Sequence, residues 1–244
     1  MSLSFIQLLN LEWKKEKRTG AFMSLVLAGC FGALYALANF TWRKATLLGL
    51  DMEPMDILLT QSYGMMALFN AFGIIVSSCL VYHIEFQEHG LEKLWALSLN
   101  MASVYLAKFL LLAIALGLAI GLESLALLGI GLFVLPPHTF ELSTWFSFSL
   151  YMVGLALPTL SLMVWIASLF ETIWIPLGIG VAGFFSAMAL APGSNLWLIN
   201  PFLLLLKPAL LLQGQVSWLL CLVALLETML FLGLGLFTSQ RRRV

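Results

Sequence analysis

Two carboxylates lie inside long apolar runs, where an ionised side chain is costly. Glu123 falls in the run 109–135, and Glu227 falls near the middle of the run 216–237. An ionisable residue at membrane depth usually faces a bundle interior or a wet cavity, and it is a functional hypothesis by default. The alternative is a neutral carboxyl group that hydrogen-bonds to a neighbouring helix and only aids packing, and Glu123 could also reach the outer interface. Both residues are therefore candidates for an intramembrane polar pathway.

A second group of candidates lies in residues 82–108, the longest polar interruption between two apolar runs. Each charged side chain there would cost roughly 2.5–3.5 kcal/mol at a bilayer centre, so the stretch does not stay in lipid. Leu91, Leu94 and Trp95 recur at helical spacing, which predicts a short helix lying at the membrane surface. That helix is either the contact point of a cytosolic partner or an ordinary amphipathic loop helix. The candidate contact residues are Glu85, Glu88, Gly90, Leu91, Glu92, Lys93, Leu94 and Trp95.

No motif for catalysis occurs in the chain. The sequence has no G-x-x-x-x-G-K-[ST], no H-E-x-x-H and no G-x-S-x-G. His83, His89 and His138 are not spaced as metal ligands, and the three cysteines lie in apolar runs. The sequence therefore predicts no enzyme, no metal site and no cofactor in this chain.

Composition indicates which elements must position these residues. The chain is 61% hydrophobic and only 10% charged, with a mean hydropathy of +1.01, whereas soluble domains are about 45–50% apolar and about 25% charged. The formal net charge is zero, so no basic patch for nucleic acid is expected. These values predict a polytopic, all-α membrane protein.

Apolar runs of about 20 residues or more predict six spans within one transmembrane domain, residues 1–244. An amphipathic helix is expected over 1–20, and Pro54 and Asp56 are typical of a helix start. Residues 191–215 are apolar but broken by prolines, which favours short helices dipping into the outer leaflet. The six spans are expected at 21–42, 57–82, 109–135, 144–170, 173–190 and 216–237.

Lysine and arginine predict the orientation. With both termini inside, nine of these residues lie on the cytoplasmic side and three outside, as the positive-inside rule requires. This orientation places a cytosolic coupling segment at 83–108 and an extracellular re-entrant segment at 191–215.

The same segment carries a family resemblance. The string from Glu85 to Leu97, followed by Tyr105–Lys108, resembles the segment after the second helix of ABC-2-type exporter permeases. It is most similar to permease subunits of antimicrobial-peptide (lantibiotic or bacitracin) immunity transporters. Residues 97–100 read Leu-Ser-Leu-Asn where that family often has Leu-Pro. The matching positions are Glu85, His89–Gly90, Glu92–Lys93 and Ala107–Lys108.

The resemblance implies a transporter subunit in the bacterial plasma membrane. A separate P-loop subunit would bind ATP and Mg²⁺ and dock on Leu91–Leu97. Two permease chains, as a homodimer or with a paralogous partner, would move an amphiphilic substrate such as an antimicrobial peptide. Asp51, Glu53 and Asp56 would attract a cationic peptide, or they serve only as helix caps and solvated groups. A different class of function is a scaffold or sensor that tethers a cytosolic partner without transport.

Overall fold

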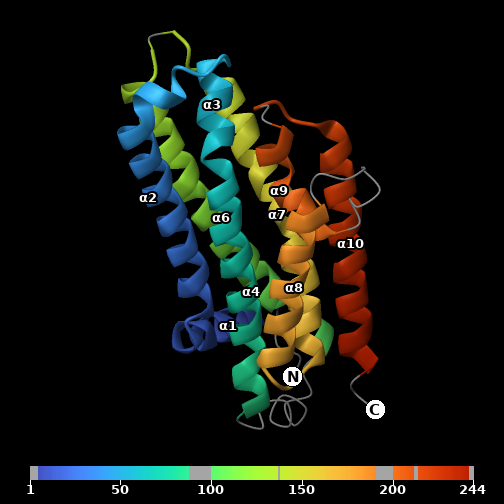
Figure 1. The fold of residues 1–244 in the computed structure, drawn as a ribbon. Helices are drawn as coiled ribbons and strands as arrows, with labels where there is room; N and C mark the ends of the chain where they lie inside the picture. Colours follow the sequence, from blue (N-terminus) through green and yellow to red (C-terminus); the bar gives the residue numbers. More distant parts are fainter. Residues whose placement is uncertain (1–4, 88–99, 137, 191–199, 212–213, 242–244) are drawn as a thin grey trace.

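The computed structural model describes residues 5–87, 100–136, 138–190, 200–211 and 214–241. The helices within these ranges run lengthwise beside one another, except α1, which lies across the lower end of the bundle (Figure 1). They are α1 (Phe5–Thr19), α2 (Ala21–Leu47), α3 (Pro54–Gln61), α4 (Tyr63–Gln87), α6 (Met101–Phe133), α7 (Leu142–Leu169), α8 (Trp174–Leu190), α9 (Pro201–Leu211) and α10 (Trp218–Arg241).

The number of spans is the first point at which the structure differs from expectation. In the described part of the chain, five helices are long and apolar enough to cross a membrane: α2, α3 with α4, α6, α7 and α10. The candidate at 173–190 forms α8, which has only 17 residues. At 1.5 Å per residue α8 covers about 26 Å, less than the ~30 Å of a hydrocarbon core. The count of six spans therefore stays a prediction.

Close packing of α2 against α6 and α4 depends on small residues. A Cβ atom added at Gly29 of α2 would lie 2.5 Å from the Cα of Ala119 on α6. On the other side, a Cβ atom at Gly73 of α4 would lie 2.7 Å from the Cβ of Ala28. Lipid chains are as apolar as leucine, so helices in a bilayer gain from such close backbone approach.

The start of α6 lies eight residues before the predicted boundary at Phe109. Asn100 caps the helix, because its side chain accepts a hydrogen bond from the Ala102 N–H at 3.2 Å. Residues 101–108 therefore belong to α6, and residues 83–87 belong to α4. The predicted span begins only at Phe109 because Lys108 was counted among the cytoplasmic cations, whereas its side chain is buried.

The helix α3 begins at Pro54, with Asp56 in its first turn, as the sequence predicts. The Asp56 carboxylate accepts a hydrogen bond from the Gly214 N–H at 2.8 Å. This contact ties the segment just before α10 to α3 at the upper end of the bundle. One of the acidic residues expected in the first outer loop therefore has a structural partner.

The helix α9 lies in the predicted re-entrant range 191–215, and residues 201–208 are all buried. Its backbone is held by side chains of two other helices. Tyr63 of α4 donates to the Leu205 carbonyl at 2.9 Å, and Thr159 of α7 donates to the Pro201 carbonyl at 3.0 Å. Figure 1 shows α8 in the lower half of the bundle and α9 above it.

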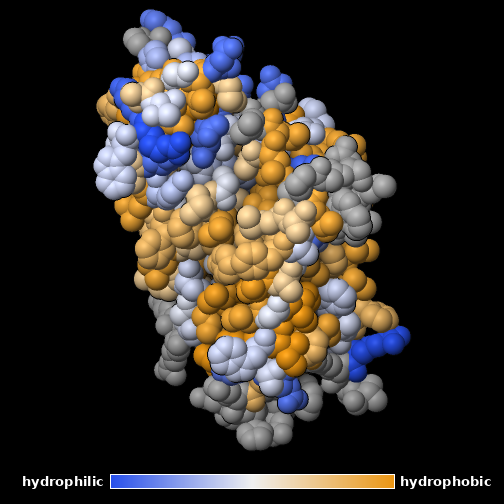
Figure 2. Space-filling view, in the orientation of Figure 1, coloured by the Kyte–Doolittle hydropathy of each residue, from blue (hydrophilic) through white to orange (hydrophobic). Residues whose placement is uncertain are grey.

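The surface has the pattern of a membrane protein. Figure 2 shows hydrophobic residues over the middle of the molecule and hydrophilic residues gathered at the upper corner, near the α2–α3 connection. Both α2 and α10 expose many large apolar side chains. An apolar belt of this kind faces lipid or another membrane protein.

Candidate functional site

A buried ion pair joins three helices at the lower end of the bundle. The ammonium of Lys108 on α6 lies 2.8 Å from Oε2 of Glu12 on α1, and both side chains are at most 2% exposed. The same ammonium lies 3.4 Å from the carbonyl oxygen of Val81 and 5.5 Å from the ring centroid of Tyr82, both on α4. Lys15, one turn along α1, contacts the other Glu12 oxygen at 2.8 Å. We call these five residues the clamp.

The electrostatics of the clamp favour an ionised Glu12. Burial by itself raises the pKa of this carboxyl, but the cations of Lys108 and Lys15 outweigh burial and lower its pKa from 4.5. A charge pair excluded from water is stable only when its hydrogen bonds are satisfied. The clamp therefore fixes α1 and the first turns of α6 against the last turns of α4.

The predicted coupling residues lie beside the clamp in the chain. Glu85 belongs to the last turn of α4, four residues after Val81. The other predicted contacts, Glu88, Gly90, Leu91, Glu92, Lys93, Leu94 and Trp95, lie outside the described residues. The clamp connects the two helices that flank this segment, one on each side.

Glu123 lies at the meeting point of α2, α4 and α6. Its side chain is fully buried, and Oε2 accepts a hydrogen bond from the amide of Asn70 at 2.8 Å. The second oxygen has no hydrogen-bond partner in the described part of the chain and faces Gly32, where a Cβ atom would overlap it. Glu123 thus bridges α6 to α4 and occupies the space that Gly32 leaves open on α2.

The other carboxylate, Glu227, lies in the middle of α10 and is half-buried. One of its oxygens is enclosed and has no hydrogen-bond partner among the described residues. Glu227 and Glu123 lie on different helices, α10 and α6.

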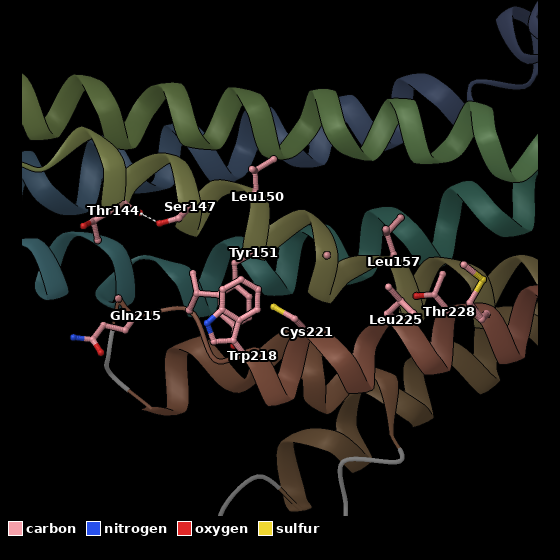
Figure 3. Close-up of a pocket in the computed structure, with 14 residues that line it drawn as sticks. Thr144, Ser147, Leu150, Tyr151, Leu157, Gln215, Trp218, Cys221, Leu225 and Thr228 are labelled. Carbon is pink, nitrogen blue, oxygen red and sulfur yellow. Dashed lines mark hydrogen bonds between the residues drawn. The ribbon is translucent and has the colours of Figure 1, made fainter.

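A cavity of about 770 Å³ lies between parts of α7 and α10, which also pack directly against each other. Figure 3 shows Thr144, Ser147 and Gln215 toward one end, with Leu157, Leu225 and Thr228 toward the other. The volume is within the ~300–1,000 Å³ typical of ligand pockets. The lining is Thr144, Ser147, Leu150, Tyr151, Gly154, Leu157, Gly214, Gln215, Val216, Trp218, Cys221, Leu225, Thr228 and Met229.

A smaller cavity of about 360 Å³ lies where α4, α8 and α9 meet. Gln61 and Gly64 line it from the α3–α4 region, Phe184 from α8, and Leu206 and Leu210 from α9. Its lining is almost wholly apolar, so any ligand there would be held by shape and burial.

A comparison of the sequence with models of known protein families agrees with this arrangement of apolar helices. The sequence model of a family described as ABC-2 family transporter protein matches residues 8–187, well over half of the chain. The chain belongs to the ABC-2 transporter family. Comparison with curated proteins and with solved structures gave no match.

Membership of the ABC-2 family makes this chain a multi-pass membrane protein of the permease type. The family match runs from Leu8 in α1 to Ala187 in α8, so it includes every residue of the clamp. The helices α9 and α10 follow the matched region.

Sequence reasoning missed two features of this ABC-2 transporter. It counted Lys108 as a cytoplasmic cation and Glu12 as part of an amphipathic helix, and it did not pair them. It also did not foresee the α7–α10 cavity. A weak signal for the pair existed, because Glu12 and Lys108 both border apolar runs at the same predicted membrane surface.

Proposed function

We propose that this chain is the membrane-spanning permease subunit of an ABC exporter. A separate subunit would bind and hydrolyse ATP with Mg²⁺, and this chain would move an amphiphilic substrate out of the cell or out of the membrane. The observation that carries the proposal is the clamp, in a chain of the ABC-2 family. It joins α1, α4 and α6 next to residues 88–99, the segment expected to receive the ATP-binding subunit.

The clamp suits transmission of force. A push on residues 88–99 acts on the end of α4 and the start of α6 together, because Lys108 bonds both to the α4 backbone and to α1. The three helices then move as one body, and closure of the ATP-binding subunits becomes a rigid-body shift in the membrane. A second permease chain, identical or paralogous, completes the pathway.

The contacts with the ATP-binding subunit follow from residue type. Glu85, Glu88 and Glu92 pair with basic residues of that subunit, while Leu94 and Trp95 pack into a groove on it. Gly90 allows the chain to reverse before the docking helix, and Leu91 and Lys93 lie within it. In this arrangement ATP and Mg²⁺ bind only to the partner.

The distribution of lysine and arginine residues supports the orientation in which both termini are cytoplasmic. The helix α1, the last turn of α4 and the last turn of α10 lie at the same end of the bundle (Figure 1), and under the positive-inside rule we place this end in the cytoplasm. We place the protein in a bacterial plasma membrane. Its resemblance to lantibiotic and bacitracin immunity permeases favours a membrane-active substrate of the antimicrobial-peptide kind.

Coexpression with an ATP-binding subunit encoded beside this chain tests the proposal. With a tag on this chain, we expect the ATP-binding subunit to copurify and its turnover in lipid to depend on the permease. Replacing Leu94 and Trp95 together by Ala should abolish copurification. The matched control is Leu118→Ala, which shortens a 51% exposed leucine in the middle of α6.

Two results would overturn the proposal. Intact copurification and transport in the Leu94/Trp95 double variant would remove the docking role of this segment. Absence of any bound ATPase after gentle extraction would favour the scaffold or sensor function instead.

A further inference from the structure

The α7–α10 cavity has the length of one membrane leaflet. It runs along α10 from Trp218, the first residue of the helix, to Met229, near the middle of its 24 residues. The eleven residue steps between them span about 16 Å at 1.5 Å per residue, close to half of the ~30 Å hydrocarbon core. Trp218 is 84% exposed, and tryptophan prefers the headgroup level. The cavity therefore extends from the membrane surface to the bilayer midplane.

The polarity of the lining changes along the same direction. Thr144, Ser147 and Gln215 lie at the end near the membrane surface, whereas Leu157, Leu225 and Thr228 lie toward the midplane (Figure 3). The hydroxyl of Thr228 already donates to the Ala224 carbonyl of its own helix at 2.7 Å, so the deep end offers a ligand mainly apolar contacts. No charged side chain is among the described residues that line the cavity. This gradient matches a molecule with one polar end and one apolar chain, and it does not match a polycationic peptide.

Tyr151 provides a polar atom at a defined depth. Tyr151 is only 4% exposed, and its hydroxyl donates no hydrogen bond within the described residues, although the Ser217 backbone lies close to its oxygen. Tyr151 is one of the residues that line the cavity (Figure 3). Tyr151 is seven residues beyond Thr144, about 10 Å deeper along α7. A buried hydroxyl without a partner is unfavourable, so a ligand acceptor at this depth would be stabilised.

Just outside the cavity, the hydroxyl of Thr144 donates to Oε2 of Glu141 at 2.8 Å. This contact places a carboxylate beside the surface end of the cavity. An anionic head group would be repelled there, whereas a zwitterionic head group can direct its cation toward Glu141.

We propose that the α7–α10 cavity binds a single-chain amphiphile that enters from the adjoining leaflet. Its head carries no net negative charge and lies near Thr144 and Gln215. A hydrogen-bond acceptor below the head, such as an ester carbonyl, receives the Tyr151 hydroxyl, and the apolar chain extends to Met229. That this amphiphile is also a transported substrate rests on the proposed function; its binding does not.

Gly154 offers a way to close the cavity without damaging the fold. It lines the cavity, and a Cβ atom added there meets nothing within 4 Å. Gly154→Phe therefore fills the cavity while raising helix propensity. Gly233 on α10 is the matched control, because it is also free of neighbours but does not line the cavity.

The test uses the full chain, purified alone in phosphatidylcholine nanodiscs. The probe is palmitoyl-lysophosphatidylcholine carrying a diazirine in its chain, and crosslinked peptides are mapped by mass spectrometry. We expect crosslinks on α7 and α10 that saturate and that excess unlabelled probe removes. Gly154→Phe should reduce them at least tenfold, and Gly233→Phe should leave them unchanged. Tyr151→Phe should weaken binding by about 2- to 10-fold, the effect of one hydrogen bond.

Several outcomes would overturn the proposal. Crosslinks that do not saturate, or that Gly154→Phe leaves unchanged, would mean that the cavity holds bulk lipid only. If palmitoyl-lysophosphatidylglycerol competed with the probe equally well, the proposed selection against negatively charged head groups would be wrong. If only a cationic amphipathic peptide displaced the probe, the proposed ligand class would be wrong. No ATPase is present in this experiment, so a failure of the probe to bind would leave the permease assignment intact. Conversely, saturable binding of the probe by a chain that recruits no ATPase would refute the permease assignment and not the lipid site.

Discussion

Lys108 and Glu12 form a salt bridge of 2.8 Å across 96 positions of sequence, with both side chains shielded from solvent. This pair explains why α6 begins before Lys108. An isolated ammonium at this position would have to reach water, but the Glu12 carboxylate compensates its charge inside the protein. The N-terminal helix α1 is therefore part of the packed structure through a specific charge, in addition to its apolar face.

Removing the charge of Glu12 should destabilise the protein more than removing the charge of Lys108. Glu12→Gln removes the anion 2.8 Å from a buried ammonium, and we expect a loss of about 5 kcal/mol in the free energy of unfolding, the upper end for breaking a buried pair. Lys108→Met should cost about 3 kcal/mol, because Lys15 still compensates Glu12. Thermal unfolding of the detergent-solubilised protein gives the ranking.

The double variant completes this experiment. Glu12→Gln with Lys108→Met removes both charges, so it should be more stable than Glu12→Gln alone. Lys15→Ala is the control, since the Lys15 side chain is 42% exposed and its pair should contribute at most about 1 kcal/mol. Strictly additive losses would show that Glu12 and Lys108 do not interact in solution.

The clamp also predicts a dependence of stability on pH. The Lys108 and Lys15 cations overcome the effect of burial and lower the pKa of Glu12 below its ordinary 4.5. Because the pKa of Glu12 is lower in the folded state, its ionised carboxylate stabilises the folded protein fully above pH 4.5. This stabilisation is lost as the pH falls through the pKa of Glu12 in the folded state. The gap in melting temperature between the natural protein and Glu12→Gln should therefore be constant above about pH 5.5 and shrink below pH 4.5. A gap that widens on acidification would contradict this sign.

The helical membrane fold was predictable because the thickness of the bilayer sets the length of a spanning helix. Each long apolar run in the sequence could therefore be assigned to a helix separately. The membrane class and the helix start at Pro54 followed from local patterns, and the ABC-2 family followed from the resemblance carried by residues 85–108. The beginning of α6 did not, because it depends on a pair that only the folded chain brings together. The sequence placed Glu123 in an apolar run but left open whether its side chain reached the outer interface. Its contact with Asn70 was not predictable either, since several polar residues of α4 were equally available.

The contact between Gly32 and Glu123 predicts that shortening Glu123 should partly restore the stability lost when Gly32 is enlarged. Gly32→Ala places a methyl group against Oε1 of Glu123, so either the buried Glu123 side chain must shift or α2 and α6 must separate, and a loss of about 1–3 kcal/mol is expected. Glu123→Ala alone leaves the amide of Asn70 without its acceptor and should cost a similar amount. Together the two changes should cost less than their sum, because the second removes the obstacle to the first.

A matched control is available on α6. Gly121→Ala introduces the same methyl group at a position where nothing lies within 4 Å, so stability should be unchanged or slightly increased. Chemical unfolding of the single and double variants in one detergent measures the coupling. A double variant as unstable as the sum of the singles would place Glu123 away from Gly32.

The position of α9 should depend on two hydroxyl groups that donate to its backbone. Tyr63→Phe and Thr159→Val each remove one donor and leave the carbonyl of Leu205 or Pro201 without that bond. A lost bond of this kind costs about 1–3 kcal/mol when the acceptor is buried. Because both bonds hold the same helix, the double variant should let α9 open locally well before the bundle unfolds. Hydrogen exchange should then rise about tenfold or more in residues 203–206, the change that ~1.4 kcal/mol gives, while the interior of α6 stays protected. Equal acceleration in α6 would mean that the two hydroxyl groups stabilise the whole bundle and do not specifically anchor α9.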